Sequence, residues 1–171
     1  ITSFAAASPD DTGSVLDTVR ANGVVRCGVR PDLPGFNNVD ESGEHVGFDA
    51  DFCRVIAAGI LGDAAAVEFV DVPTENRFTA LAAGEYDVLV RNTTWTASRD
   101  GNEGAEFLHT TFFDGQGMMV PADLGVSSLA EMEGANICVA AGTTTEGNVA
   151  NEFARLGLNA DIRSFPDVPA I

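Results

Sequence analysis

Two segments of the sequence place an apolar run directly before a cluster of hydroxyl side chains. In residues 84–99, GEYDVLVRNTTWTASR, the run leads into a group rich in Asn and Thr, and Arg99 follows. In residues 137–148, ICVAAGTTTEGN, it leads into Gly142 and three threonines. Short runs of β-branched and aromatic residues predict buried strands, and capping residues after them predict helix starts. The sequence therefore predicts an α/β fold with two strand–turn–helix units.

Each of these turns has the chemistry of a small-anion site. A helix N-terminus offers N–H groups and the positive end of the helix dipole. Arg99 adds a planar fork that suits a carboxylate. Thr143 and Glu146 have capping-box spacing, so the second helix is expected to begin at Thr143 or Thr144. An ordinary helix cap explains either cluster alone, and the repetition makes two turns that clamp one ligand an equal alternative.

Strands and helices alternate along the first part of the sequence. Caps and hydrophobic periods predict helices at 14–21, 49–62 and 74–83, and strands at 24–29, 67–72 and 86–90. This β–α–β order is typical of a mostly parallel sheet. Asp49 is expected to cap the second helix, and residues 30–45 form either a plain loop or one wall of a pocket.

The rhythm changes at residues 107–120, FLHTTFFDGQGMMV, which predict a further strand that crosses out of the first sheet at Gly115 and Gly117. Ser128 and Glu131 then cap a short helix ahead of a second strand–helix–strand set at 137–165. We divide the chain as follows: 1–12, a leader remnant or disordered tail; 13–119, a first α/β lobe; 120–171, the start of a second, incomplete α/β lobe.

Composition excludes several classes of protein. The 171 residues are 45% hydrophobic, which suffices for a real core, and no stretch approaches the ~20 apolar residues of a membrane span. We therefore expect a chain that does not itself span a membrane. The net charge is −17, with 26 acidic residues, nine basic residues and no lysine. Such a charge repels a phosphate backbone, so nucleic acid is not an expected partner.

Metal-binding residues are few and poorly spaced. The two histidines, His45 and His109, are isolated, and the three cysteines lack a C-x-x-C spacing. We therefore expect neither a metal site nor a cofactor. A buried free thiol is the ordinary state for each cysteine of a protein that is not exported.

Five blocks of the sequence occur in the order of a known family. They are VVRCGVRPDLPGF, GFDADFCRVIAAGILGD, NRFTALAAGEYDVLVRNTTWTASRD, FFDGQGMMV and ICVAAGTTTEGN, within about residues 13–165. The chain resembles the periplasmic solute-binding proteins of polar amino-acid ABC importers, especially the general L-amino-acid branch, for which the RNTTWT-x-SRD block is distinctive. The resemblance implies the type 2 periplasmic-binding-protein fold, in which two α/β lobes close over an amino acid. Those proteins are longer, so the first lobe is expected to be largely present and the second incomplete.

The resemblance also implies roles for single residues. Arg99 matches the arginine that pairs with the ligand α-carboxylate, and Thr94 and Asn92 match neighbouring positions that contact the backbone part of the ligand. In the second lobe, the anion contacts match Gly142 and Thr144, with Thr143 between them.

Two further positions bear on specificity. The pocket-wall aromatic residue of many relatives aligns with Leu33, with Phe36 nearby, and Arg30 stands where an acidic residue often receives basic ligands. These departures favour a broad or a polar and acidic specificity over a lysine or arginine specialist.

The function implied by the resemblance is that of a binding protein and not of an enzyme. It captures free L-amino acids in the periplasm and presents them to ABC permease subunits. One alternative is an amino-acid-sensing receptor domain of the same fold. A periplasmic lyase on this fold is a weaker alternative, because the sequence offers no paired carboxylates in a matching motif and no lysine.

Export would also change the expected state of the cysteines. In an oxidising compartment a disulfide is expected between Cys27, on the first predicted strand, and Cys53, on the helix that follows it. Cys138 would then have no partner in this sequence.

Overall fold

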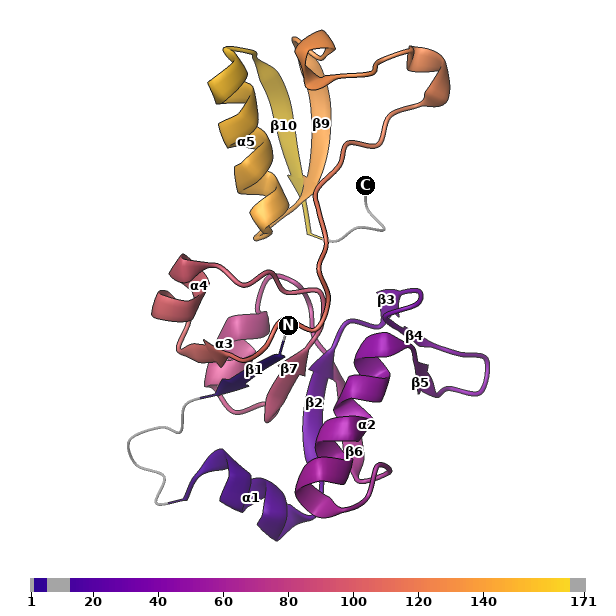
Figure 1. Cartoon of the computed structure of the whole chain (residues 1–171), viewed down its shortest axis with the longest axis vertical. Helices are drawn as coiled ribbons and strands as arrows, with labels where there is room; N and C mark the ends of the chain where they lie inside the picture. Colours follow the sequence, from indigo (N-terminus) through magenta and orange to yellow (C-terminus); the bar gives the residue numbers. More distant parts are fainter. Residues whose placement is uncertain (1, 6–12, 167–171) are drawn as a thin grey trace. The chain divides into compact units, whose positions relative to one another are not determined.

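A computed structural model describes residues 2–5 and 13–166 of the chain. These residues form two compact units, and the division between them falls between Phe112 and Phe113 (Figure 1). The lobe limits 13–119 and 120–171 stay a prediction. Of the predicted leader or tail, residues 2–5 form a strand, and the rest lies outside the described residues.

The first unit is built on a five-stranded sheet with the strand order β6-β2-β7-β1-β8. β2 pairs in parallel with β6 and β7, whereas β1 pairs antiparallel with both β7 and β8. The strands are β1 (Thr2–Ala5), β2 (Val25–Val29), β6 (Val67–Asp71), β7 (Val88–Val90) and β8 (Ala105–Phe107). The predicted β–α–β order and parallel pairing of the first three sequence-predicted strands are confirmed.

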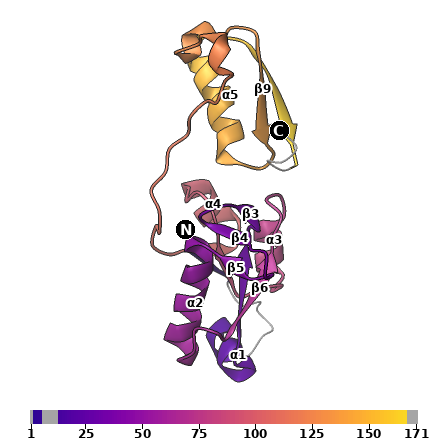
Figure 2. The same cartoon turned by 90° about the vertical axis from the view of Figure 1, so that its right-hand side faces the viewer.

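Helices cover both faces of this sheet (Figure 2). Cys53 and Ala57 of α2 pack with Val29 of β2 on one face, and Phe78 of α3 packs with Leu89 of β7 on the other. The helices of the first unit are α1 (Val15–Asn22), α2 (Phe48–Leu61), α3 (Arg77–Ala82) and α4 (Ala97–Asn102). Burial on both faces explains why β2 and β7 are nearly continuous apolar runs.

The helix predicted over 14–21 forms as α1, whereas the N-cap predicted for α2 is wrong. Ser14 and Asp17 form a capping box at the start of α1, and Gly23 ends that helix with φ 69°. The N-cap of α2 is Gly47, with φ 121°, and a Cβ there would lie 2.5 Å from the carbonyl oxygen of Phe36. Asp49 lies instead in the first turn, where burial raises the pKa of its carboxyl.

Three other expectations need correction. Of the two alternatives for residues 30–45, the plain loop is wrong, because the segment 30–46 contains a small antiparallel sheet of β3 (Asp32–Leu33), β4 (Asn37–Val39) and β5 (His45–Val46), while the pocket wall stays a prediction. Strands this short leave no periodic signal in a sequence. The helix expected at 74–83 begins only at Arg77. The strand expected over 107–120 is wrong, because after Phe107 no strand or helix forms before η1.

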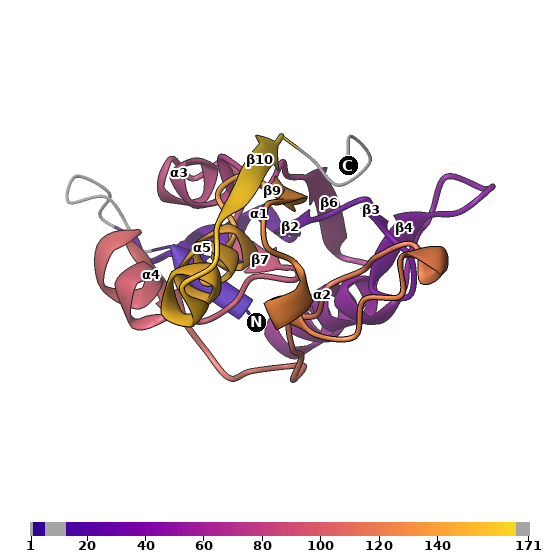
Figure 3. The ribbon, with the colours of Figure 1, turned by 90° about the horizontal axis from the view of Figure 1, so that it is seen from above.

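The second unit is a β–α–β element, with α5 lying along the strands β9 and β10 (Figure 3). β9 and β10 pair in parallel, with Ala135 opposite Ala160. Ile137, Val139, Val149 and Phe153 form its core. The elements are η1 (Ala122–Leu124), η2 (Leu129–Glu131), β9 (Ala135–Ala140), α5 (Thr144–Leu156) and β10 (Ala160–Phe165). The predicted capping box of Ser128 and Glu131 and the helix start after Thr143 are confirmed.

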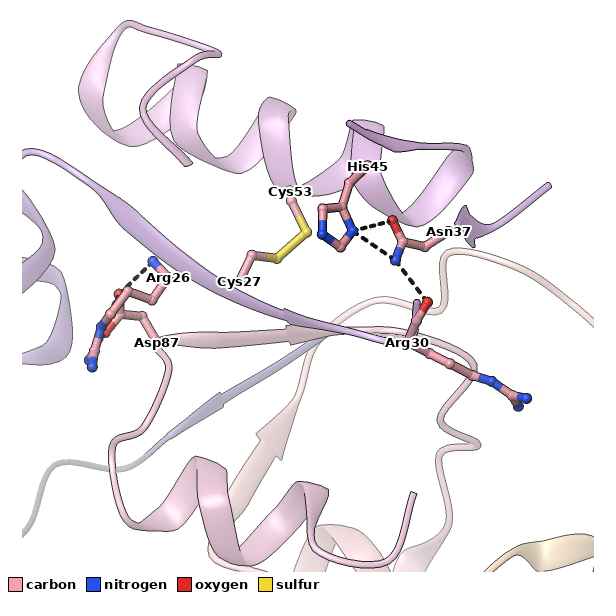
Figure 4. The surroundings of a disulfide bond; sticks show 7 residues. All are labelled: Arg26, Cys27, Arg30, Asn37, His45, Cys53 and Asp87. Atoms are coloured by element: carbon pink, nitrogen blue, oxygen red, sulfur yellow. Dashed lines mark hydrogen bonds and ion pairs between the residues drawn. A yellow bond between two sulfur atoms is a disulfide. The ribbon is translucent and has the colours of Figure 1, made fainter. Parts of the chain in front are cut away.

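A disulfide bond joins Cys27 of β2 to Cys53 of α2 (Figure 4). The two Cα atoms lie 6.0 Å apart, and both residues are fully buried. The predicted pairing is therefore confirmed. Cys138 carries a free thiol and is exposed, so the expectation of a buried thiol is wrong at that position.

Reduction of this bond should lower the free energy of unfolding by about 3 kcal/mol, because the bond closes a loop across 26 residues of the unfolded chain. Urea unfolding followed by circular dichroism, with and without dithiothreitol, measures the loss. The Cys138→Ser variant is the control and should show the same loss as the parent. Equal stability of the oxidised and reduced parent would contradict a stabilising role for the bond.

Candidate functional site

The carboxyl ends of β2, β6 and β7 bring arginine and threonine side chains to one edge of the sheet. Arg30 follows β2, Thr74 follows β6, and Arg91 follows β7. Parallel strands end at the same edge, and in open α/β sheets ligands bind in the crevice outside it. This edge is therefore the candidate site of the first unit.

Arg99 is held at this edge by the turn that precedes α4. Thr96 caps the helix, and its hydroxyl oxygen accepts a hydrogen bond from the Arg99 backbone N–H at 3.2 Å. The Arg99 side chain is buried, and Nη1 donates to the carbonyl oxygen of Thr94 at 2.9 Å. The structure thus brings together Arg99 and Thr94, two of the residues that the sequence selected.

Arg77, at the start of α3, is a second buried guanidinium near this edge. Its Nη1 donates to the carbonyl oxygen of Thr74, and burial lowers its pKa to about 10, with a further contribution from the charge of Arg99. The hydroxyl of Tyr86 donates to the Arg77 carbonyl oxygen, and burial raises the pKa of Tyr86 to about 12. The phenol is therefore a neutral donor at any physiological pH.

The ring of Phe78 supports two of these cations. The Arg77 guanidinium carbon lies 4.9 Å from the ring centroid, and that of Arg99 lies 5.6 Å from it. Phe78 also packs at 6.3 Å against Phe107, on which Trp95 stacks at 6.2 Å. Phe78, Phe107 and Trp95 thus form an aromatic row, and its Phe78 ring contacts both guanidinium groups.

Arg30 enters the edge from β2 and is paired with an acid. Its Nε lies 2.5 Å from Asp32 Oδ1, and Nη2 lies 3.0 Å from Oδ2, an arrangement that lowers the pKa of Asp32. The Asn37 amide donates to the Arg30 carbonyl oxygen at 2.8 Å and lies 3.2 Å from Nδ1 of His45 (Figure 4). The small sheet therefore anchors the backbone of Arg30.

The other predicted site residues of the first unit are Asn92, which follows Arg91 in the sequence, and Leu33 and Phe36, which lie a few residues after Arg30. The Asn92 side-chain oxygen accepts from Arg91 Nη2 at 3.4 Å. Leu33 is half-buried in β3. Phe36 packs edge-on against Phe48 and Phe112, with ring centroids 6.0 and 4.9 Å away. Phe36 is thus part of an aromatic cluster.

Sequence reasoning missed Arg77 and Arg91. Arg91 directly follows a buried strand at its carboxyl end, a signal that was present in the sequence. Arg77 lies inside the helix predicted over 74–83, and an arginine in a helix is usually a solvated surface charge. Only the structure shows that both are buried.

In the second unit, the predicted turn before α5 forms as expected. The Thr143 hydroxyl caps α5 by accepting from the Glu146 backbone N–H at 3.2 Å, and it donates to the Ala140 carbonyl oxygen at 2.6 Å. The Glu146 carboxylate accepts from the Gly142 backbone N–H at 3.1 Å and from the hydroxyl of Ser164. A carboxylate of the chain thus already lies at this turn, while Thr144 is the first residue of the helix.

No group of three side chains that could hold a metal ion occurs among residues 2–5 and 13–166. Within the same residues, no helix combines the length and apolar character needed to cross a membrane.

Comparisons with known proteins agree on one family. A family model described as "Bacterial extracellular solute-binding proteins, family 3" matches residues 25–156. The glutamate/glutamine/aspartate/asparagine-binding protein of Rhodobacter capsulatus is 51% identical over 142 residues, which are 83% of this chain and 42% of that protein. The general L-amino acid-binding periplasmic protein of Rhizobium johnstonii is 44% identical over 160 residues, 94% of this chain and 47% of that one. The chain thus spans about half the length of these relatives.

A solved structure gives the same result. An ABC transporter periplasmic binding protein from Brucella ovis with glutathione bound has a TM-score of 0.87 and 42% identity. The match covers 92% of this chain and 50% of that chain.

Gly28 of β2 should be required for the position of the Tyr86 ring, and therefore for the hydrogen bond from the Tyr86 hydroxyl to the Arg77 carbonyl oxygen. A Cβ at Gly28 would lie 2.8 Å from two carbon atoms of the Tyr86 ring. Gly28→Ala should therefore lower the free energy of unfolding by about 1–3 kcal/mol, the cost of overpacking a core. Gly59→Ala in α2 is the matched control, since nothing lies within 4 Å of the added methyl group and Ala favours a helix. Urea unfolding should therefore move the two midpoints in opposite directions; a Gly28→Ala midpoint at or above the parent's would refute the clash.

Proposed function

Because the chain belongs to the bacterial extracellular solute-binding proteins, family 3, we propose that it captures free L-amino acids for an ABC importer. The resemblance found in the sequence is confirmed, and so is the type 2 periplasmic-binding-protein fold, of which the chain covers about half. The relatives from Rhodobacter capsulatus and Rhizobium johnstonii are named as amino-acid-binding proteins, which supports an amino acid as the ligand.

The observation that carries the proposal is the placement of Arg99. Its guanidinium lies at the carboxyl edge of the sheet, where the Thr94 carbonyl oxygen and the Phe78 ring hold it in place. A planar fork in this position suits the α-carboxylate that every free L-amino acid carries. Thr94 and Asn92 lie in the same turn and supply further polar groups for the backbone part of the ligand.

The other arginines favour polar and acidic amino acids. Arg30 and Arg77 add two buried cations at the edge where Arg99 lies. An acidic side chain carries a second carboxylate that such cations attract, whereas a lysine or arginine side chain would be repelled. The name of the Rhodobacter relative, which covers two acidic amino acids and their amides, agrees with this specificity.

The partners and location follow from the same family membership. We propose that the protein acts in the periplasm and delivers its ligand to the membrane subunits of a permease. The Cys27–Cys53 bond supports an oxidising compartment. Family and relatives are solute-binding proteins, and a role in binding without catalysis fits them. The turn of Gly142, Thr143 and Thr144 remains a predicted second anion contact.

Arg99→Met should weaken the binding of L-glutamate by about 2–4 kcal/mol, the scale of a lost, partly buried charge-assisted contact. A titration followed by NMR measures even weak affinities. Arg155→Met is the matched control, because it removes the same charge from an exposed position of α5. An unchanged affinity in the Arg99 variant would remove Arg99 from the site, and a parent chain that binds no amino acid would refute the proposed function.

A further inference from the structure

Arg91 is the most deeply buried charged side chain at the carboxyl edge, with an exposure of 2%. Its Nη1 donates to the Val72 carbonyl oxygen at 2.7 Å, and Nη2 donates to the Thr74 hydroxyl at 2.9 Å. Both acceptors follow β6, whereas Arg91 follows β7, and β2 lies between those strands. Two strand spacings amount to about 10 Å. The Arg91 side chain therefore extends across the carboxyl end of β2, at the edge of the sheet where the ligand is expected to bind.

Arg91 has two cations, Arg77 and Arg30, and two carboxyl groups, Asp32 and Asp49, in its surroundings, and neither carboxyl is paired with it. Among the residues that the structure describes, no carboxylate lies within the 4.0 Å of an ion pair with it. Burial lowers its pKa to about 10, with further contributions from Arg77 and Arg30, whereas Tyr86 and Asp32 act in the opposite sense. Asp49 also interacts with Arg91, whose charge lowers the pKa of the Asp49 carboxyl against the larger effect of burial. Asp32 is already paired with Arg30, and the pKa of the buried carboxyl of Asp49 is raised.

Hydrogen bonding alone does not explain a charge at this position. The acceptors of Arg91 are a carbonyl oxygen, a hydroxyl oxygen and the amide oxygen of Asn92, which a neutral amide could also satisfy in part. Burying a cation beside two other cations is costly unless something negative compensates it. The compensation can come from a ligand that carries more negative charge than positive.

We propose that Arg91 is a specificity-determining residue, whose buried positive charge favours ligands with a second carboxylate over their neutral amides. This inference rests on the proposed function. Its action is electrostatic and extends beyond contact distance, since Coulomb interactions in a poorly solvated site decay slowly. Glutamate and glutamine have nearly the same shape and the same α-ammonium and α-carboxylate groups. They differ by one negative charge, so the ratio of their affinities isolates the effect.

The test compares the glutamate-to-glutamine affinity ratio in the parent, Arg91→Gln and Arg91→Lys. NMR titration, or the fluorescence of Trp95, the single tryptophan, follows the binding. Removal of the charge in Arg91→Gln should lower the ratio about tenfold, and Arg91→Lys should keep it at neutral pH. Arg20→Met, an exposed change of equal charge at the end of α1, is the control and should leave the ratio unchanged.

Two outcomes would overturn the inference: an unchanged ratio in Arg91→Gln, whether or not both ligands bind more weakly, or the same drop in the ratio in Arg91→Lys. Equal weakening would mean that the fork only ties β6 to β7. If the parent binds both ligands equally well, the inference fails while the proposed function stands. If it binds neither, the proposed function itself fails.

A second measurement covers an Arg91→Gln variant that does not fold. A buried lysine loses its proton at a lower pH than a free one, whereas arginine stays charged. In Arg91→Lys the glutamate-to-glutamine ratio should therefore fall relative to that of the parent as pH rises from 7 to about 9, a range in which Arg91 of the parent, with a pKa of about 10, keeps its charge. Titration of the ligand α-ammonium affects the ratio in the parent and in the variant alike, so the parent serves as the reference at each pH. A ratio in Arg91→Lys that is flat relative to that of the parent over this range would overturn the inference.

Discussion

Guanidinium groups that are cut off from water lie at the carboxyl ends of β2, β6 and β7, and each needs an electron-rich partner inside the protein. Backbone carbonyls supply most of these partners: Val72 for Arg91 and Thr94 for Arg99. The Phe78 ring supplies a π face for two of them. The turns after β6 and β7 are therefore stabilised by the hydrogen bonds that their carbonyl oxygens accept from these arginines.

The buried arginines concentrate positive charge at one edge of the sheet, in a chain whose net charge is negative. With 26 acidic and nine basic residues, the surface as a whole repels anions. Four of the nine basic residues are the buried Arg30, Arg77, Arg91 and Arg99. An anion that reaches the edge of the sheet thus meets a local field of the opposite sign. In the second unit the corresponding donor, the Gly142 N–H, is already bonded to Glu146, so an external anion would have to replace that carboxylate.

The sequence predicted those parts of the fold that have local signals. Ser14, Gly23 and Thr143 mark helix ends by their own chemistry, and buried strands such as β7 are continuous apolar runs. It failed where tertiary contact decides. Gly47 replaces Asp49 as a cap because the carbonyl of Phe36 leaves no room for a Cβ. Arg77 and Arg91 were missed because a sequence does not show that a charge is buried. Arg99 was found because it follows a recognisable turn.

The order of the cysteines along the chain has a consequence for biosynthesis. Within this sequence Cys27 and Cys53 are neighbouring cysteines, and Cys138 comes 85 residues after Cys53. Because synthesis proceeds from the N-terminus, the two partners can reach an oxidising environment before the third thiol has emerged. The correct bond can then close between successive cysteines, once β2 and the first turns of α2 are out. A bond that closes before Cys138 emerges avoids competition from that thiol, and it then needs no later thiol–disulfide exchange to reach the native pairing.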